Sequence, residues 1–403
     1  MNETSLKAPV DIFVVGLVSG GHFFSHFYGL VLPPLFAFMA VDLEVGYGEL
    51  GLLLSAMAAA SAVTQVPAGI IVDRCGPVWP LIAGICLRAG AILLMGITPS
   101  YWGFLALAVV SGAGNSVFHP ANYSILSTGV RARWIGRAFS VHTFAGHLGW
   151  AAAPVFTGFF AVAGSWRNAL IATGLAGLAM GLVLLLQQGR LRQRAHFRDP
   201  GNDHRELQRN YPFLACLTAP VLTILIVFLL DALAMKGFQT FFIPVLMTTH
   251  SATVAAASAL LSLFFAGSAL GILLGGFLAD RTPHHRAVAA LSLVVTALLI
   301  TTMGAMTTTN VFFFILAVVT GLCHGLLPPF RDMIVRSMAP RHATGRVFAI
   351  VSTGFDIGSA LAPLLFAVAL DAEKPMVVFW IAAACLAAAG GSVVTELCKP
   401  EHV

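Results

Sequence analysis

Charge is the scarcest property of this sequence. Only 10% of its 403 residues are charged and 58% are hydrophobic, whereas soluble domains carry about 25% charged and roughly 45–50% apolar residues. So few charges cannot cover a water-soluble surface, and a single soluble core stops growing near ~250–300 residues. A bilayer-spanning helix needs about 20 apolar residues, so the chain has room for about a dozen of them. The composition predicts a polytopic membrane protein.

The sequence also lacks the motifs of nucleotide, metal and disulfide chemistry. It has no G-x-x-x-x-G-K-[ST] loop for ATP phosphates and no H-E-x-x-H zinc motif. Its six cysteines show no C-x-x-C spacing, which indicates packing residues. His22 and His26, four residues apart, give only a weak signal for a divalent ion. We therefore expect no cofactor, no resident metal and no enzymatic activity.

What the sequence has instead is a series of long apolar runs rich in Leu, Ala and Gly. Strands of a membrane barrel would alternate over about ten residues, so the longer runs predict helices. The first run lacks a small-residue cleavage site, which indicates a span rather than a removed signal peptide. The twelve runs cover residues 11–40, 47–72, 77–97, 101–128, 135–163, 166–187, 212–247, 252–279, 286–306, 309–338, 343–370 and 375–397.

Basic residues gather in alternate connections between these runs. Because cytoplasmic loops carry an excess of Lys and Arg, the pattern predicts a multi-pass protein of the plasma (bacterial inner) membrane with both termini in the cytoplasm. The net charge of +5 then reflects topology, and we expect no nucleic-acid partner. The basic connections hold Arg74, Arg131, Arg133, Arg137, Arg281, Arg286, Arg341 and Arg346, and the opposite ones hold Arg167 and Lys374 beside Asp42, Glu44, Glu49, Asp371 and Glu373.

The longest polar connection, residues 188–211, divides the chain into two halves of six runs each. The halves are residues 1–187 and 212–403. We interpret the connection as a solvated cytoplasmic linker, although its arginines leave lipid or partner binding open. They are Arg190, Arg192, Arg194, Arg198, Arg205 and Arg209.

An internal repeat relates the two halves. GRAFS from Gly136 and GWAAAP from Gly149 recur as GRVFA from Gly345 and GSALAP from Gly358, at a constant offset (345 − 136 = 209). An even number of spans separates the copies, so both halves have the same orientation, as in one repeat scheme of secondary transporters. The predicted fold is all-α, with twelve transmembrane helices in two pseudo-symmetric six-helix bundles.

Two motifs make the chain resemble a known family. G-x-x-x-D-R occurs at Gly69–Arg74 and again at Gly276–Arg281, after the second span of each half. This pattern resembles the signature loop of the major facilitator superfamily. More narrowly, SGAGNSVFHP (111–120) and GHLGWAAAP (146–154) resemble the fosmidomycin-resistance branch. The resemblance implies two six-helix bundles around a central cavity lined by the first, fourth, seventh and tenth helices.

The chain departs from that branch at three places. Ala121 follows the His-Pro pair where the branch has Glu, and His26 lies near the place of a helix 1 Asp. The usual arginine early in the fourth helix is absent, because residues 107–109 are Leu-Ala-Val. If these acids carry protons in such relatives, other residues must carry them in this protein. Fosmidomycin itself is not the expected substrate.

Ionisable residues within spans are costly, about 2.5–3.5 kcal/mol on insertion scales, and mark functional sites. The 209-residue offset pairs His22 with Asp231, Asn115 with His324, Asn122 with Arg331 and His147 with Asp356. Helical spacing also places several of these residues on shared faces. We predict a cavity for substrate and protons lined by His22, His26, Asn115, His119, Asn122, Tyr123, His147, Asp231, Lys236, His324, Arg331, Asp332 and Asp356.

The remaining polar residues of the spans and loops have other expected roles. Arg88 is assigned to helix packing, because the third helix of the resembled fold is peripheral, and His142 is left open between packing and cavity. The repeated motifs predict gates whose charges bind helix ends in one state and release them in the other. The gate residues are Gly69, Asp73, Arg74, Gly276, Asp280 and Arg281.

The expected function is secondary active transport of a small polar or anionic solute by alternating access, coupled to protons. Histidine titrates near neutral pH, and Arg331, helped by Lys236, is the expected counter-charge. Drug efflux by antiport and import of a metal or metal chelate stay open, as does a transporter-like membrane sensor. The expected partners are the solute, protons and the lipid bilayer, and the expected state is a monomer.

Overall fold

The computed structural model describes residues 12–130, 132–195, 217–338 and 344–397, and all its regular elements are helical. They are α1 (Ile12–Phe27), η2 (Tyr28–Leu30), η3 (Pro33–Leu35), α2 (Phe36–Asp42), α3 (Tyr47–Cys75), α4 (Val78–Ile97), α5 (Tyr101–Asn115), α6 (Phe118–Gly129), α7 (Ala132–Ala163), α8 (Trp166–Leu186), α9 (Gln188–Ala195), α11 (Ala219–Thr249), α12 (Val254–Ala279), α13 (His285–Ala305), α14 (Val311–Met338), α15 (Thr344–Asp371) and α16 (Val377–Leu397).

Within the described residues, twelve helical spans are long and apolar enough to cross a membrane. They confirm the predicted all-α membrane fold. The first span, Ile12–Asp42, joins α1, the two short 3-10 turns and α2, and the fourth, Tyr101–Gly129, joins α5 and α6. Residues 196–216 lie outside the described part of the chain, so the linker predicted at 188–211 is seen only as far as α9.

Prolines explain the two interrupted spans. A proline has no N–H to donate, and its ring clashes with the carbonyl four residues earlier. Pro120 stands four residues after Ser116, and α5 ends at Asn115 before α6 begins at Phe118. Pro33 and Pro34 likewise occupy the 3-10 turn that separates α1 from α2. The helix of the fourth span is therefore interrupted at the point where its polar residues lie.

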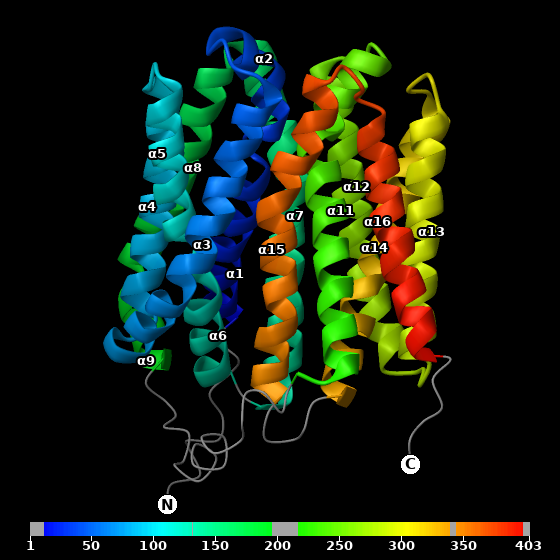
Figure 1. Cartoon of the computed structure of the whole chain (residues 1–403). Helices are drawn as coiled ribbons and strands as arrows, with labels where there is room; N and C mark the ends of the chain where they lie inside the picture. Colours follow the sequence, from blue (N-terminus) through cyan, green and yellow to red (C-terminus); the bar gives the residue numbers. More distant parts are fainter. Residues whose placement is uncertain (1–11, 131, 196–216, 339–343, 398–403) are drawn as a thin grey trace, which may run out of the picture.

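The helices form two groups that meet along two seams. In Figure 1, α1–α6, α8 and α9 lie on one side, α11–α14 and α16 on the other, and α7 and α15 between them. The seams are the packing of α3 against α15 and of α7 against α12. Each seam therefore joins a helix of the first half to one of the second.

Within each half, glycines let helix backbones touch. A Cβ at Gly112 would meet the carbonyl of Met57, and a Cβ at Gly321 would meet the carbonyl of Phe264. The two glycines are related by the 209-residue offset, so α5 packs on α3 as α14 packs on α12. Small residues that permit such approach are typical of membrane helix interfaces.

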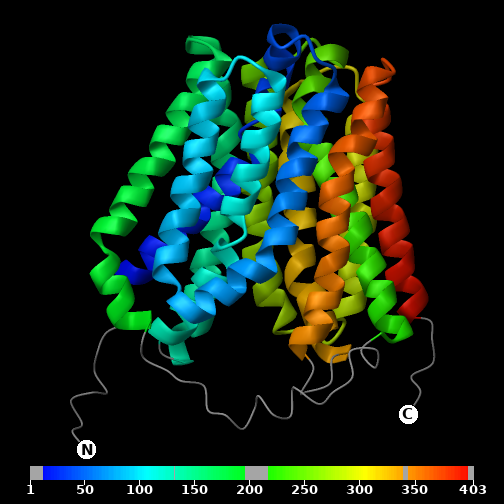
Figure 2. The same ribbon diagram turned by 60° about the vertical axis from the view of Figure 1, so that its left-hand side comes forward.

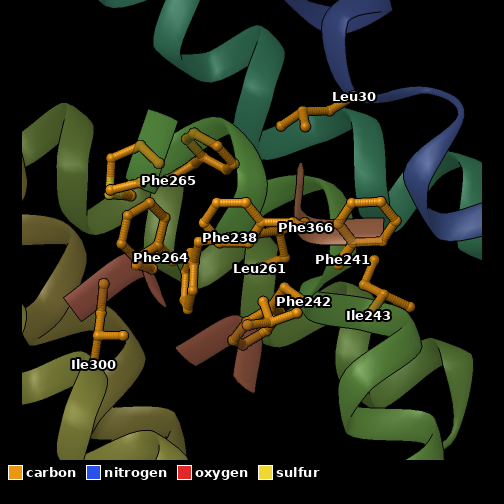
Figure 3. Close-up of a cluster of buried hydrophobic side chains, with 14 of the residues drawn as sticks. Leu30, Phe238, Phe241, Phe242, Ile243, Leu261, Phe264, Phe265, Ile300 and Phe366 are labelled. Carbon is orange, nitrogen blue, oxygen red and sulfur yellow. The ribbon is translucent and has the colours of Figure 1, made fainter. Parts of the chain in front are cut away.

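A phenylalanine cluster forms the centre of the second half. Buried rings from α11, α12 and α15 meet there, with Ile300 of α13 at its edge (Figure 3). Neighbouring rings lie at centroid distances of 5.0 Å for Phe238 and Phe242 and 5.3 Å for Phe264 and Phe265. Because aromatic side chains bury large areas and their edges attract neighbouring faces, this cluster ties α11 to α12 and α15.

Where the structure describes them, the predicted basic and acidic connections lie at opposite ends of the bundle. Arg131, Arg198, Arg205, Arg209 and Arg341 lie outside the described residues. The C-termini of α3 and α12 and the helix α9 lie at the end drawn at the bottom of Figures 1 and 2, which we name the basic end. Arg74 belongs to the last turn of α3, and Arg281 lies just beyond the last residue of α12. α2 and the C-terminus of α15, with Asp42 and Asp371, lie at the other end, which we name the acidic end.

Candidate functional site

A cavity of about 390 Å³ lies between the two halves. Side chains of α1, α3, α4, α5, α6 and α7 line it from the first half, and α11 and α15 line it from the second. Its volume suits a small solute, since ligand pockets measure about 300–1,000 Å³. The polar lining consists of Ser25, His26, Ser61, Gln65, Arg88, Asn115, Ser116 and His119 from the first half and Lys236, Gln239, Thr240, Asp356 and Ser359 from the second.

Two cations face this cavity, one from each half. Arg88 of α4 donates a hydrogen bond to the Asn115 amide oxygen, and the Asn115 nitrogen donates to Ser61 Oγ at 3.0 Å. Lys236 of α11 places its Nζ 5.0 Å from the centre of the Trp150 ring. Neither cation forms an ion pair with a carboxylate among the described residues. Asp356 is the one carboxylate among the lining residues, so the cavity carries a formal surplus of positive charge.

Five imidazoles from α1, α6 and α7 gather beside the cavity, and we name them the histidine cluster. The rings of His22 and His142 stack with centroids 3.8 Å apart. His22 also lies 4.4 Å from His26 and 5.7 Å from His119. His147 completes the cluster at 6.1 Å from His26. Only His26 and His119 of the cluster line the cavity.

Trp150 connects the histidine cluster to both the cavity cation and the second half. Its indole lies 4.1 Å from the His26 ring and 4.9 Å from His147. It also lies beneath Lys236 and 5.5 Å from the Phe265 ring on α12. The indole is therefore placed where the two halves and the cavity meet.

A separate ionic network occupies the second half. His324 Nε2 lies 3.0 Å from Asp231 Oδ1, and Arg331 Nη1 lies 3.5 Å from Asp231 Oδ2. Arg331 Nε is also 3.6 Å from Asp332 Oδ1, and its guanidinium lies 4.0 Å from the centre of the Phe228 ring. Arg331 does not line the cavity. Contrary to the expectation that it faces the solute, this arginine is paired with carboxylates of its own half.

The predicted site residues therefore fall into two sets. His26, Asn115, His119, Lys236 and Asp356 line the cavity. The other set lies behind it or beyond it, in the histidine cluster, in the ionic network or on α6, and consists of His22, Asn122, Tyr123, His147, Asp231, His324, Arg331 and Asp332. Asn122 is fully buried, and neither polar atom of its amide has a partner among the described residues.

Comparison with known proteins decides the family. The profile of the Major Facilitator Superfamily matches residues 18–242 and 224–397. The chain belongs to the Major Facilitator Superfamily. The structure agrees, because a bacterial homologue of the human lysosomal transporter Spinster, in an inward-facing and unoccupied conformation, superposes with a TM-score of 0.79. That match covers 98% of this chain and 100% of the other at 15% identity, and so concerns the fold alone.

Two curated proteins are similar to this superfamily member over about two thirds of its length. The fosmidomycin resistance protein of Escherichia coli (strain K12) is 20% identical over 280 residues, 69% of this chain and 68% of its own length. A probable hexose phosphate transport protein of Chlamydia pneumoniae is 24% identical over 294 residues, 65% of this chain and 62% of its own length. The family and the fold of this protein are those of transporters, and the family supports membrane transport of a solute.

The paired signature motifs of the superfamily lie at the basic end. Asp73, Arg74, Asp280 and Arg281 are all exposed, and none forms an ion pair with the described part of the chain. The Arg281 guanidinium lies 3.6 Å from the centre of the Phe277 ring. Gly69 and Gly276 have open space where a Cβ would be. Within the described ranges, the motif charges thus form no ion pair across the two halves.

Sequence reasoning missed several cavity residues of this transporter. Arg88 was assigned to packing, yet it faces the cavity, and an arginine within an apolar run was the signal that marked it. Trp150 lies within the GHLGWAAAP motif but was not singled out, because an indole in a span resembles ordinary core filler. No group of three or more His, Cys, Asp or Glu residues within the described ranges is placed to hold a metal ion.

Proposed function

We propose that this protein is a secondary active transporter that carries a small anionic solute by alternating access and couples this movement to protons. It would lie in the plasma membrane with the basic end and both termini in the cytoplasm, because cytoplasmic loops carry the excess of Lys and Arg. Two cations beside a single carboxylate in one central cavity support this function most strongly.

The positions of Arg88 and Lys236 favour an anion over a neutral solute. Both groups line the same cavity, so their positive charges repel each other, and a cation in a partly dehydrated site needs a counter-charge. An anion that contacts both would supply it, and Ser61, Gln239 and Thr240 could hydrogen-bond its polar groups. Because the cations come from different halves, the anion would also bridge the two bodies that must move.

Contacts across the seams support alternating access. At the acidic end, the Asp371 carboxylate of α15 accepts hydrogen bonds from the backbone of Tyr47 and Gly48 on α3, both at 2.8 Å. Gly51 of α3 also packs against the carbonyl of Pro363. At the basic end, the charges of both signature motifs are exposed and unpaired with the described residues. This asymmetry fits a state closed at the acidic end.

The test is binding and uptake by the purified full-length protein in detergent and in proteoliposomes. The probes are gluconate, glucose 6-phosphate, inorganic phosphate and sulfate, together with uncharged glucose. We expect at least one anion to bind and accumulate, and glucose to do neither. Lys236→Gln should raise the dissociation constant about tenfold or more, since hydrogen bonds to charged groups contribute about 1.5–3 kcal/mol and 1.4 kcal/mol is a factor of ten.

The matched control is Lys374→Gln, which removes an exposed lysine far from the cavity lining. Its binding should equal that of the wild type. Selective binding of glucose, or anion binding that Lys236→Gln leaves unchanged, would contradict an anionic substrate held by Lys236.

Export of an anionic antibiotic is a second candidate. The similarity to the fosmidomycin resistance protein supports it, while Ala121 and His26 stand where that branch carries acids. Expression in a drug-sensitive bacterial host distinguishes the two. Resistance to fosmidomycin that Lys236→Gln abolishes would favour export, and unchanged sensitivity together with anion uptake would favour the first candidate.

A further inference from the structure

The proposed function leaves open which groups carry the proton, and the composition of the histidine cluster is unusual for a membrane interior. Five imidazoles lie within 6.1 Å of a neighbouring ring of the cluster. Yet no carboxylate hydrogen-bonds to any of them among the described residues, where the one His–Asp pair is His324 with Asp231 in the other half. Polar groups buried in this way normally find partners.

Several ring nitrogens of the cluster are unpartnered. Both nitrogens of His142, which is 2% exposed, and Nδ1 of His26 have no hydrogen-bond partner within the described structure. His147 Nδ1 lies 3.0 Å from the Thr143 carbonyl, which leaves Nε2 of that ring free to bind a proton. An unprotonated imidazole nitrogen accepts a proton, so these free nitrogens can bind one when the charge around them favours it.

The cluster and the cavity share two residues. His26 and His119 belong to the cluster and also line the cavity that Arg88 and Lys236 face. His22 and His142 lie behind them, with His22 in ring contact with both lining histidines. A proton bound at the lining histidines can thus be passed to rings that do not touch the solute.

The charge of the cavity affects how readily the cluster binds a proton. Arg88 from α4, Lys236 from α11 and Asp356 from α15 line the cavity together with His26, and the Tyr123 ring on α6 lies 6.3 Å from His142. Lys236 and His26 contact the same Trp150 ring, so Lys236 repels a positive charge on His26, and Arg88 adds to the positive field of the shared cavity. An anion bound to these cations would cancel that repulsion. Because stacked His22 and His142 would also repel each other as a doubly charged pair, one proton is the expected load.

We propose that the histidine cluster binds one proton when an anion enters the cavity beside Arg88 and Lys236, so that proton and anion cross the membrane together. This inference rests on the function proposed above. The proton comes from water and adds to an imidazole nitrogen, and no other bond forms or breaks. Because coupling is reciprocal, bound protons must strengthen anion binding as much as the anion strengthens proton binding.

The experiment measures protons taken up when the anion binds. Calorimetric titrations use the panel anion with the highest affinity, in pairs of buffers that differ in protonation enthalpy, between pH 5.5 and 8.5. After subtraction of the anion's own protonation, we expect about one proton taken up per anion near neutral pH. At pH values at which the cluster of the free protein is unprotonated, the dissociation constant of the anion should fall by up to about tenfold for each unit by which the pH decreases.

His22→Asn tests the assignment to the cluster, because His22 does not line the cavity. It should lower proton uptake by at least half while leaving the dissociation constant at pH 8.5 within twofold. His284→Asn, which replaces an exposed histidine outside the cluster, is the matched control and should behave as the wild type. A thermal unfolding curve checks that each variant is folded. If His22→Asn does not fold, the number of protons that the wild type takes up tests the proposal by itself.

The outcomes separate the two proposals. Anion binding without proton uptake, or uptake that His22→Asn leaves unchanged, overturns the role of the cluster and leaves the anion transporter standing. Release of protons on binding overturns it as well and favours exchange of the anion against protons. If none of the panel anions binds, the proposed function fails and this inference fails with it.

Discussion

The carboxylate of Asp371, the last residue of α15, caps the N-terminus of α3 at Tyr47 across the boundary between the two halves. Its Oδ1 accepts the Tyr47 N–H and its Oδ2 accepts the Gly48 N–H, both at 2.8 Å. The first N–H groups of a helix have no partner within the helix, and a negative charge there also interacts favourably with the helix dipole. The Asp371 carboxylate therefore links the two halves by backbone hydrogen bonds at the acidic end.

Asp371→Ala should open the acidic end. Loss of a capping side chain costs about 0.5–2 kcal/mol, which corresponds to a shift of roughly two- to thirtyfold in the ratio of the two states. Spin labels at Val41 and Lys374, exposed residues of opposite halves near this end, would report the opening as a longer distance in a background without the native cysteines. Asp42→Ala is the control, since Asp42 pairs at 2.9 Å with Arg167 of its own half. Equal distance distributions in Asp371→Ala and Asp42→Ala would contradict the role of Asp371 in keeping the acidic end closed.

Arg331→Gln should destabilise the protein rather than weaken solute binding. Arg331 and Asp231 are both largely buried, with 16% and 6% of their side chains exposed, and removing one partner of a buried pair costs about 3–5 kcal/mol. Thermal unfolding should show a marked loss that Asp231→Asn in the same chain partly restores. Arg336→Gln, an exposed arginine of the same helix, should be neutral. A loss of anion affinity without a change in stability would show instead that Arg331 binds the solute.

Gly112→Ala and Gly321→Ala should each lower thermal stability. The new methyl groups would press on the carbonyls of Met57 and Phe264, and overpacking of this kind costs about 1–3 kcal/mol. Gly90→Ala in α4 is the matched control, because nothing lies within 4 Å of its added Cβ. There the better helix propensity of Ala, about 0.8–1.0 kcal/mol, should keep or raise stability. Similar melting temperatures for all three variants would show that the close helix contacts are unimportant.

Asp73→Asn should slow transport while leaving binding unchanged. In this state the Asp73 carboxylate is exposed and remote from the cavity lining, so it cannot affect the solute directly. If the motif charges bind helix ends in the opposite state, their loss lowers turnover at least threefold, with the dissociation constant within twofold. Proteoliposome uptake and equilibrium binding measure the two quantities. Glu373→Gln, an exposed acid at the other end, serves as control, and a Kd change in Asp73→Asn alone would contradict a gating role.

The architecture was predictable because its signals are local. The length of each apolar run defines a span, and the 209-residue offset can be read from the sequence alone. The membership of the superfamily was predictable for the same reason, since the G-x-x-x-D-R motif appears twice.

The contacts of the candidate residues were not predictable, because they depend on how helices cross. The offset pairs His22 with Asp231, but His22 stacks on His142 while Asp231 binds His324 and Arg331. Equivalent positions thus acquired different partners. Arg88 likewise reaches the cavity only because α4 packs against α5 and brings it to Asn115.

Trp150 offers a way to observe the protein at work. Its indole contacts His26 and His147 and lies 5.0 Å beneath the Lys236 ammonium. Indole fluorescence responds to nearby charge, and a protonated imidazole quenches it. Among the six tryptophans, this one should therefore change its emission when solute or protons enter. The transport cycle could then be followed by intrinsic tryptophan fluorescence, without an attached dye.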